Sequence, residues 1–251
     1  MRPGKPMTPT IRSALLAPAM WCLALLPMLG QAATTGSGRA ASETRSLPAF
    51  EAIALAGSID LRVRQGATQA VEVTADDNLL PLLETMVEST SKGATLNVRW
   101  KRGENISTRS RVTVDVVVPH LRSLAAAGAG DIRAEGLETP ALRISLAGSG
   151  DVRLLGLSTE ELAVGISGSG SVEGNGRATR LKVSIAGSGD VELADLRADE
   201  VSITIAGSGD AEVQAQKTLD VTISGSGDVG YRGDAVVKQS VQGSGSVTRK
   251  K

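Results

Sequence analysis

The sequence predicts an all-β chain whose second half forms a right-handed parallel β-helix, a β-solenoid with coils of about 20 residues. Two observations support this: a glycine motif that recurs at nearly constant spacing, and apolar residues that alternate strictly between its copies. The composition agrees, because 29 of 251 residues are glycine and only 2% are aromatic. Such a chain has many turns and an aliphatic core.

The motif reads Gly-Ser-Gly or Gly-Ala-Gly, followed by Asp or Ser. Its seven copies begin at Gly128, Gly148, Gly168, Gly187, Gly207, Gly225 and Gly243. Successive copies thus begin 20, 20, 19, 20, 18 and 18 residues apart. Gly-Ser tracts also occur in flexible linkers, but here apolar residues alternate before each motif, as at Leu142, Ile144 and Leu146. That alternation is typical of a strand with one buried face.

Each repeat therefore comprises a strand, a corner, a second strand and a looser return. One such unit cannot bury its apolar face alone, whereas stacked units share a continuous core. Parallel connections are overwhelmingly right-handed, which sets the predicted hand. Corner glycines allow positive φ and close approach between coils. The predicted corner positions are Gly128, Gly130, Gly148, Gly150, Gly168, Gly170, Gly187, Gly189, Gly207, Gly209, Gly225, Gly227, Gly243 and Gly245.

Residues 1–32 have the pattern of a secretory signal peptide. Three basic residues precede the 16-residue apolar run Ala14–Leu29. Small residues at Gly30 and Ala32 suit cleavage after Ala32, with cleavage after Ala33 as the alternative. An uncleaved N-terminal anchor is the alternative. Cleavage leaves 24 basic and 27 acidic residues, no cysteine and no transmembrane segment. We expect an exported protein, either periplasmic or at the cell surface or outside the cell.

The rest of the chain is predicted to be one continuous domain after a linker. Residues 33–46 are small and polar and are expected to be a flexible linker. Residues 47–120 form an N-terminal β portion that caps the solenoid, and residues 121–251 form the repeats. Within the cap, Phe50–Val63 resembles a degenerate first coil, and Asp76–Val87 has room for one short helix. At the other end, Gln239 replaces an apolar residue and blunts the open sheet edge.

Several of these features together resemble one bacterial family, the putative auto-transporter adhesin, head GIN domain. They are the Phe50-Glu-Ala-Ile53 strand, the Asp76-Asp-Asn-Leu-Leu stretch, the Val114–Pro119 strand and the serial corners that end in Asp228-Val-Gly-Tyr231-Arg-Gly233. The resemblance covers about Phe50 to Val247. It implies an exported right-handed β-helical domain whose function is largely unestablished. Nothing in the C-terminal sequence has the pattern of membrane-barrel strands, and a shared fold does not carry a shared function.

One acidic position recurs at the corners, and three roles fit it. It is occupied by Asp131, Asp151, Asp190, Asp210 and Asp228, with Ser171 and Ser246 at two corners. The favoured role is to bind turn amides next to the residue's own corner, which Asp and Ser can both do. The second is calcium binding by carboxylates on adjacent coils. The third is polysaccharide cleavage by a pair of acids, which repetition at nearly every corner disfavours.

Other candidate sites are few. Trp100, flanked by Arg99, Lys101 and Arg102, is a candidate ligand contact, because an aromatic ring beside cations can stack on a sugar. The alternative is a half-buried tryptophan on an edge strand. A single cysteine and a single histidine argue against zinc sites and most histidine-based catalysis, and no cofactor site is predicted. The formal net charge of zero gives no case for nucleic acid.

These observations predict a non-catalytic exported β-solenoid. The first hypothesis is an adhesin-like surface module that binds envelope or extracellular macromolecules, either protein or glycan. The second is a periplasmic scaffold or binding protein that maintains the envelope. A carbohydrate-active enzyme is the third and is the least favoured.

Overall fold

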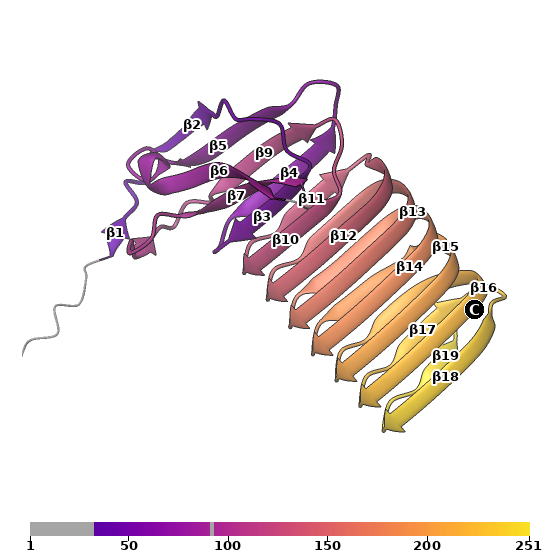
Figure 1. The fold of residues 1–251 in the computed structure, drawn as a ribbon. Helices are drawn as coiled ribbons and strands as arrows, with labels where there is room; N and C mark the ends of the chain where they lie inside the picture. The colour runs from indigo at the N-terminus through magenta and orange to yellow at the C-terminus, as the bar shows by residue number, and fades with distance from the viewer. Residues whose placement is uncertain (1–32, 91–92) are drawn as a thin grey trace, which may run out of the picture. The chain divides into compact units, whose positions relative to one another are not determined.

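The computed structural model describes residues 33–90 and 93–251, so the predicted signal peptide lies outside the described residues. Almost all of the regular structure is strand (Figure 1). The N-terminal portion contains β1 (Thr34–Thr35), β2 (Ala40–Thr44), β3 (Ala52–Ala56), β4 (Asp60–Gln65), β5 (Ala70–Asp76), the short 3-10 helix η1 (Leu80–Leu82), β6 (Leu83–Thr90), β7 (Gly93–Trp100), β8 (Ile106–Ser107) and β9 (Thr113–Val118). The repeats contain β10 (Ser123–Gly128), β11 (Ile132–Glu135), β12 (Glu138–Gly148), β13 (Val152–Gly168), β14 (Ser171–Gly187), β15 (Asp190–Gly207), β16 (Ala211–Gly225), β17 (Val229–Arg232), β18 (Val236–Gly243) and β19 (Val247–Arg249).

The repeats stack as the coils of a parallel β-solenoid, which confirms the predicted fold class. Equivalent residues of successive coils are direct partners across neighbouring strands. One such row reads Leu124, Ile144, Val164, Val183, Ile203 and Val221. The degenerate coil at Phe50–Val63 is also confirmed, because β3 pairs with β10 and β4 pairs with β11.

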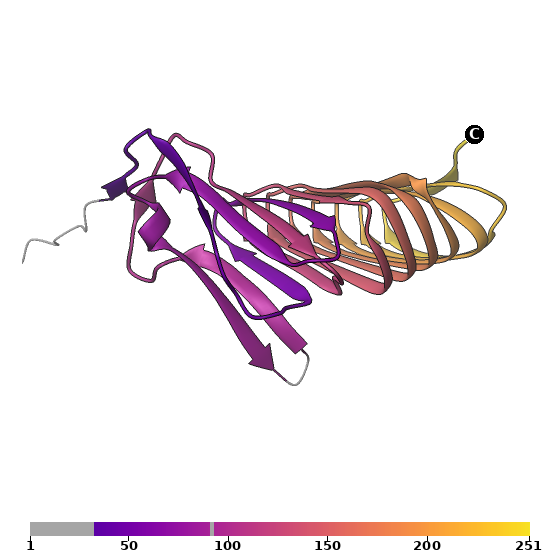
Figure 2. The same ribbon diagram turned by 90° about the horizontal axis from the view of Figure 1, so that it is seen from above.

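Each coil is flattened into two layers with the core between them (Figure 2). The segment before the corner alternates buried and exposed residues, as in β12, where Leu142, Ile144 and Leu146 are buried. The segment after the corner contributes Val152 and Leu154 to the same aliphatic core. Burial of these side chains is the main source of stability, because a single coil has no apolar interior of its own.

The first glycine of each corner meets two structural demands, and the second meets one of them. Gly207 has a φ of +140°, and a Cβ atom there would lie 2.1 Å from the carbonyl oxygen of Gly187 in the preceding coil. Gly209 has no positive φ, yet a Cβ atom there would lie 2.1 Å from the oxygen of Gly189. Close approach is therefore common to both corner positions, while positive φ is confined to the first glycine of each motif.

The register between coils is continuous in the segment that leads into each corner. Register shifts occur only on the return side, where the first lies between Leu154 and Leu157 and the last between Ala198 and Glu200. The 18-residue coils are thus shortened in the return, and the corners remain aligned from β10 to β18.

The structure differs from the expected flexible linker at residues 33–46, because this segment contains β1 and β2. Strand β2 pairs antiparallel with β5. Asn78 anchors the turn between β1 and β2. Its Oδ1 accepts a hydrogen bond from the backbone N–H of Ser37 at 2.9 Å, and its Nδ2 donates to the carbonyl oxygen of Thr35 at 2.9 Å. The partners of this segment are distant in sequence, from Glu72, the partner of Thr44, to Ile106, the partner of Thr34, so local composition alone did not reveal them.

The short helix expected in Asp76–Val87 is only the 3-10 turn η1. The chain then continues as β6, which pairs antiparallel with β7. Leu79 and Leu83 are both buried, so this turn anchors the hairpin to the core. Within the described residues, no helix is both long enough and apolar enough to cross a membrane.

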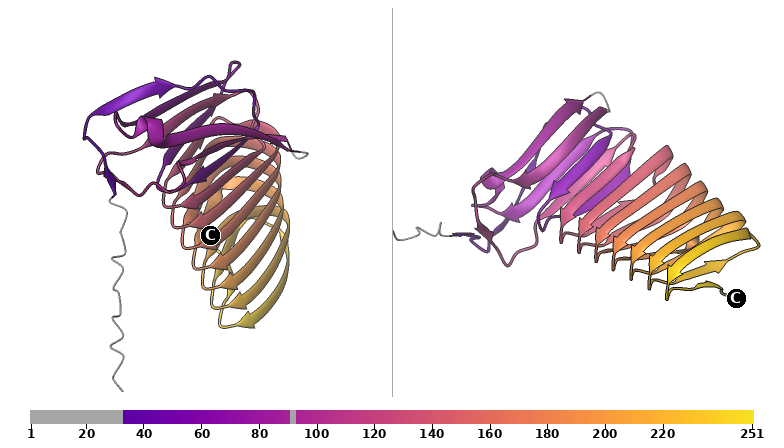
Figure 3. Two further views of the ribbon diagram at one scale, coloured as in Figure 1. Left: turned by 60° about the vertical axis from the view of Figure 1, so that its left-hand side comes forward. Right: turned by 60° about the horizontal axis from the view of Figure 1, so that its bottom comes forward.

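The C-terminal end of the stack has β18 as the edge of one layer and β19 as the edge of the other (Figure 3). Gln239 is the register partner of buried Val221 and is itself exposed. Two valines of β18 are also exposed, Val236 at 77% and Val241 at 37%. A polar residue in the apolar row, together with Lys238, makes this edge less able to pair with another strand.

Candidate interaction surfaces

The outer side of the segments before the corners forms a regular, nearly featureless surface, which we call the small-residue face. Two adjacent rows of outward side chains run its whole length without a charge. The first row is Ala54, Ala125, Ser145, Gly165, Ser184, Thr204, Thr222 and Ser240, and the second is Ala56, Ala127, Ala147, Ser167, Ala186, Ala206, Ser224 and Gln242. With strands about 4.8 Å apart, the face is about 34 Å long and covers roughly 500 Å².

This face differs from an ordinary protein surface, about a quarter to a third of which is charged. Charges border the two rows in the flanking row, at Arg143, Lys182, Asp220 and Lys238, and at the N-terminal end, where Arg99 is the partner of Ala56. Short side chains lose little conformational entropy on contact and let a partner approach closely. The arrangement suits a flat and extended partner.

The predicted file of corner aspartates lies at the edge of the two layers. Each carboxylate Oδ1 accepts a hydrogen bond from the backbone N–H of the next coil, as in Asp228 N–H to Asp210 at 2.7 Å and Asp210 N–H to Asp190 at 3.0 Å. Ser171 and Ser246 donate to the preceding aspartate through both N–H and Oγ. The carboxylates thus link successive coils, whereas the sequence had suggested bonds within each corner.

Asp60 begins this file, because its Oδ1 accepts from the N–H of Asp131 at 3.1 Å. The degenerate corner Gly57-Ser58-Ile59-Asp60 was the available signal for it. In the described part of the chain, no three His, Cys, Asp or Glu side chains are grouped so that they could hold a metal ion. The observed hydrogen bonds favour the structural role over calcium binding.

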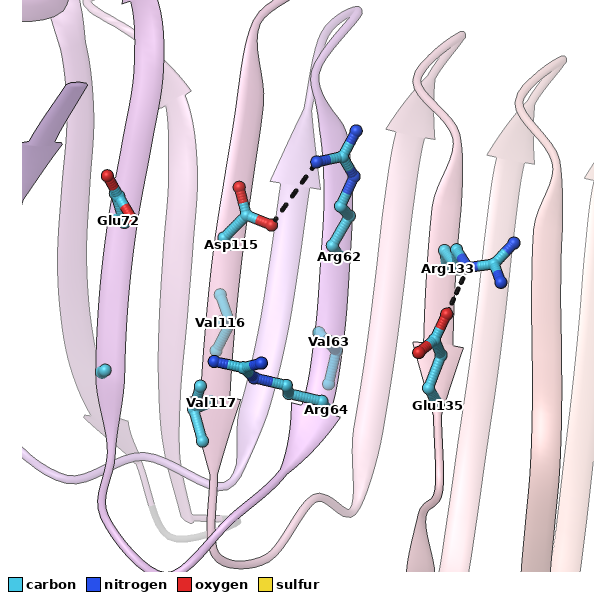
Figure 4. Close-up of a pocket in the computed structure, with 10 residues that line it drawn as sticks. Arg62, Val63, Arg64, Glu72, Asp115, Val116, Val117, Arg133 and Glu135 are labelled. Atoms are coloured by element: carbon cyan, nitrogen blue, oxygen red, sulfur yellow. Dashed lines mark hydrogen bonds and ion pairs between the residues drawn. The ribbon is translucent and has the colours of Figure 1, made fainter.

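The opposite layer presents what we call the charged face, the outward side chains that follow each corner. Figure 4 shows its N-terminal end, a shallow depression of about 390 Å³ between β5, β9, β4 and β11. Arg62 lies 3.8 Å from Asp115, and Arg133 pairs with Glu135 on its own strand. Sequence analysis missed this face, although its residues stand five positions after each first corner glycine.

Trp100 ends β7 beside the first corner and is only partly exposed. A Cβ atom on Gly57 would lie 3.4 Å from its Cδ1, so the indole packs over that corner and against the core. Its neighbour Arg99 is engaged with Glu84 through Nε to Oε2 at 3.1 Å. The indole is thus half-buried, which disfavours a free stacking platform. The strand is not an edge strand as expected, because β7 pairs with β3 on one side and with β6 on the other.

A buried carboxylate that the sequence did not single out lies at the end of β5. Asp76 is 1% exposed and accepts from Ser110 Oγ at 2.6 Å and Thr108 Oγ1 at 2.7 Å. These two hydroxyl bonds lower the pKa of Asp76, because they stabilise its charged form more than burial disfavours it. The network fastens the β8–β9 connection to β5 and has a structural geometry.

Comparison with known proteins agrees with this architecture. A putative adhesin from Bacteroides fragilis has a TM-score of 0.79 at 23% identity, covering 86% of this chain and 100% of that one. A putative lipid binding protein from Parabacteroides distasonis has a TM-score of 0.72 at 26% identity over 88% and 100%. A putative adhesin from Parabacteroides merdae has a TM-score of 0.66 at 25% identity over 87% and 99%.

A search of curated proteins found no significant match. A family model does match, over residues 49–235, and its description is "Putative auto-transporter adhesin, head GIN domain". The matched range includes the first coil, the cap and all but the last corner, which confirms the resemblance drawn from the sequence. The chain therefore belongs to the putative auto-transporter adhesin, head GIN domain family.

Proposed function

We propose that the protein is a non-catalytic, exported interaction module of the bacterial envelope that binds a macromolecular partner through the small-residue face. The uninterrupted pair of uncharged rows from Ala54 to Gln242 is the observation that carries this proposal. The names of two structural relatives, both putative adhesins, are consistent with a binding role.

Location distinguishes adhesion from a periplasmic role. The first experiment is protease treatment of a tagged chain on intact cells, on osmotically opened cells and in the culture medium. Cleavage on intact cells, or recovery from the medium, supports an adhesive module. Protection until the envelope is opened would refute adhesion and favour the periplasmic scaffold or binding protein.

Use of the small-residue face is tested by matched substitutions. Thr204→Arg places a long cation in the middle of the face, while Thr179→Arg makes the same change at an exposed return position. The probes are immobilised neutral polysaccharides, extracellular-matrix protein coats and phospholipid vesicles. The vesicles test the lipid-binding activity named for one relative. We expect Thr204→Arg to weaken binding to the recognised probe about tenfold and Thr179→Arg to leave it unchanged. Equal effects of the two changes would rule out this face.

A further inference from the structure

The charges of the charged face are sorted by sign along the stack. The row that stands five residues after each first corner glycine consists of direct cross-strand partners. In order along the stack it reads Arg62, Arg133, Arg153, Glu173, Glu192 and Glu212. From β4 to β16, three cations are followed by three anions, with a change of sign between Arg153 and Glu173. On the cap side the row continues through Asp115, the partner of Arg62, and Glu72, the partner of Asp115, so the sign changes a second time there.

This order is unfavourable for an isolated chain. Neighbours in the row are about 4.8 Å apart, and like charges directly opposite each other on adjacent strands are destabilising. An alternating order would give the single chain favourable pairs instead. The segregated row therefore calls for an explanation outside the single solenoid.

Contacts within the chain compensate only part of the row. Arg153 pairs with Glu173 at the change of sign, Arg133 pairs with Glu135 on its own strand, and Lys250 pairs with Glu212. Arg62 and Asp115 approach only to 3.8 Å, which is beyond hydrogen-bond distance. Among the described residues, Glu192 makes no ion pair within 4.0 Å.

A second copy turned end for end carries the complementary order. A two-fold axis parallel to the strands, placed between the coils of Arg153 and Glu173, brings charged face against charged face and reverses the row. Arg62 then faces the partner's Glu212, Arg133 faces the partner's Glu192 and Arg153 faces the partner's Glu173. Every facing pair is of opposite sign. We propose that the protein forms a two-fold symmetric dimer through the charged face.

The size of the surface predicts a weak dimer. Six strands and about four residues of each segment cover roughly 400 Å² per copy, so the total lies in the range of transient interfaces. The aspartate file brings like charges together at one rim, which limits the affinity further. Charge complementarity would mainly select the register and the antiparallel orientation, and added salt would screen it.

This dimer gives the proposed function a second contact. The charged face and the small-residue face belong to opposite layers of each coil (Figure 2), so pairing leaves both small-residue faces free and directed away from each other. Two weak contacts presented in this way can bind a repetitive surface with higher avidity, or connect two surfaces. The dimer itself does not depend on whether the small-residue face binds anything.

The test is charge reversal followed by charge exchange. Sedimentation velocity of the purified full chain is measured over a concentration series in about 20 mM and about 0.5 M NaCl. Arg133→Glu and Glu192→Arg should each weaken the low-salt dimer at least about tenfold, because each creates two like-charge contacts. Their combination in one chain should restore it, because residues 133 and 192 face each other across the axis. Arg143→Glu beside the small-residue face is the matched control and should have no effect.

Circular dichroism confirms that each variant is folded. A wild-type chain that stays monomeric at low salt and the highest concentration overturns the proposal. The proposal is also overturned if the single reversals do not weaken the dimer, or if Arg143→Glu weakens it equally. Failure of the combined Arg133→Glu and Glu192→Arg variant to recover the dimer overturns it as well. Loss of probe binding in the Thr204→Arg variant with an intact dimer would separate the two proposals.

Discussion

Alanine substitutions at three glycines separate the two demands that each corner makes on its residues. Gly156 has a φ of +67° and open space where a Cβ atom would lie, Gly209 has only the 2.1 Å approach to a backbone oxygen, and Gly207 has both. Left-handed backbone costs an L-residue about 1–2 kcal/mol. A buried overlap that the structure must relax costs about 1–3 kcal/mol.

The expected loss of unfolding free energy is therefore about 1–2 kcal/mol for Gly156→Ala, about 1–3 for Gly209→Ala and about 2–5 for Gly207→Ala. The overlap is difficult to relieve because the opposing atom is the backbone of a neighbouring coil that is itself held on both sides.

Urea denaturation followed by circular dichroism gives these free energies, and thermal melting gives a second measure. For a domain of this size, about 1 kcal/mol corresponds to a melting shift of about 2–4 °C, so Gly207→Ala should melt about 4–20 °C lower. If Gly207→Ala costs no more than Gly156→Ala, the close approach between coils does not limit residue choice, and the explanation of the repeated glycines is refuted.

Three further predictions concern the corner file, the buried carboxylate and the open edge. Asp210→Ala should cost about 1 kcal/mol in urea denaturation because the N–H of Asp228 loses its acceptor. Asp210→Asn should cost less, and added Ca²⁺ should leave the melting temperature unchanged; a calcium-dependent rise would support the ion-binding role instead. The pKa of Asp76 is lowered from 3.8 in the folded chain, so its stabilisation is present above that pH and is lost as the pH falls through the folded pKa. Urea denaturation should show a weaker loss of stability below pH 4 in Asp76→Asn than in wild type, and identical acid profiles would contradict this. Gln239→Val should increase aggregation measured by light scattering, because it completes an apolar row on the exposed edge; an unchanged association state would show that Gln239 does not protect the edge.

The solenoid was predictable because its determinants are local and repeated. The alternation at Leu142, Ile144 and Leu146 and the fixed spacing of the corners record both the burial pattern and the stacking. The N-terminal segment was harder to predict, because β2 is ordered by distant parts of the chain, namely β5 and Asn78. No local pattern at Ala40–Thr44 reports such distant partners.

The surfaces were predictable only in part. The sequence showed that the corner aspartates occupy equivalent positions in successive repeats. It did not show that each carboxylate accepts from the next coil, because that choice of partner depends on how one coil stacks on the next. The row from Arg62 to Glu212 becomes meaningful only once the register shows its members to be direct neighbours. Trp100 shows the opposite case, since its conspicuous sequence context gave no sign that its ring covers Gly57.

The confinement of register shifts to the return side has a consequence for how such a protein can change in length. One repeat can be duplicated or deleted between equivalent positions of two coils. The coils on either side of the change then stack directly on each other with their corners and strands still in register. Irregular lengths such as 18, 19 or 20 residues are absorbed away from the small-residue face. The length of that face is thus adjustable in steps of about 4.8 Å, and descendants with more or fewer coils would present the same lattice of side chains over a longer or shorter distance.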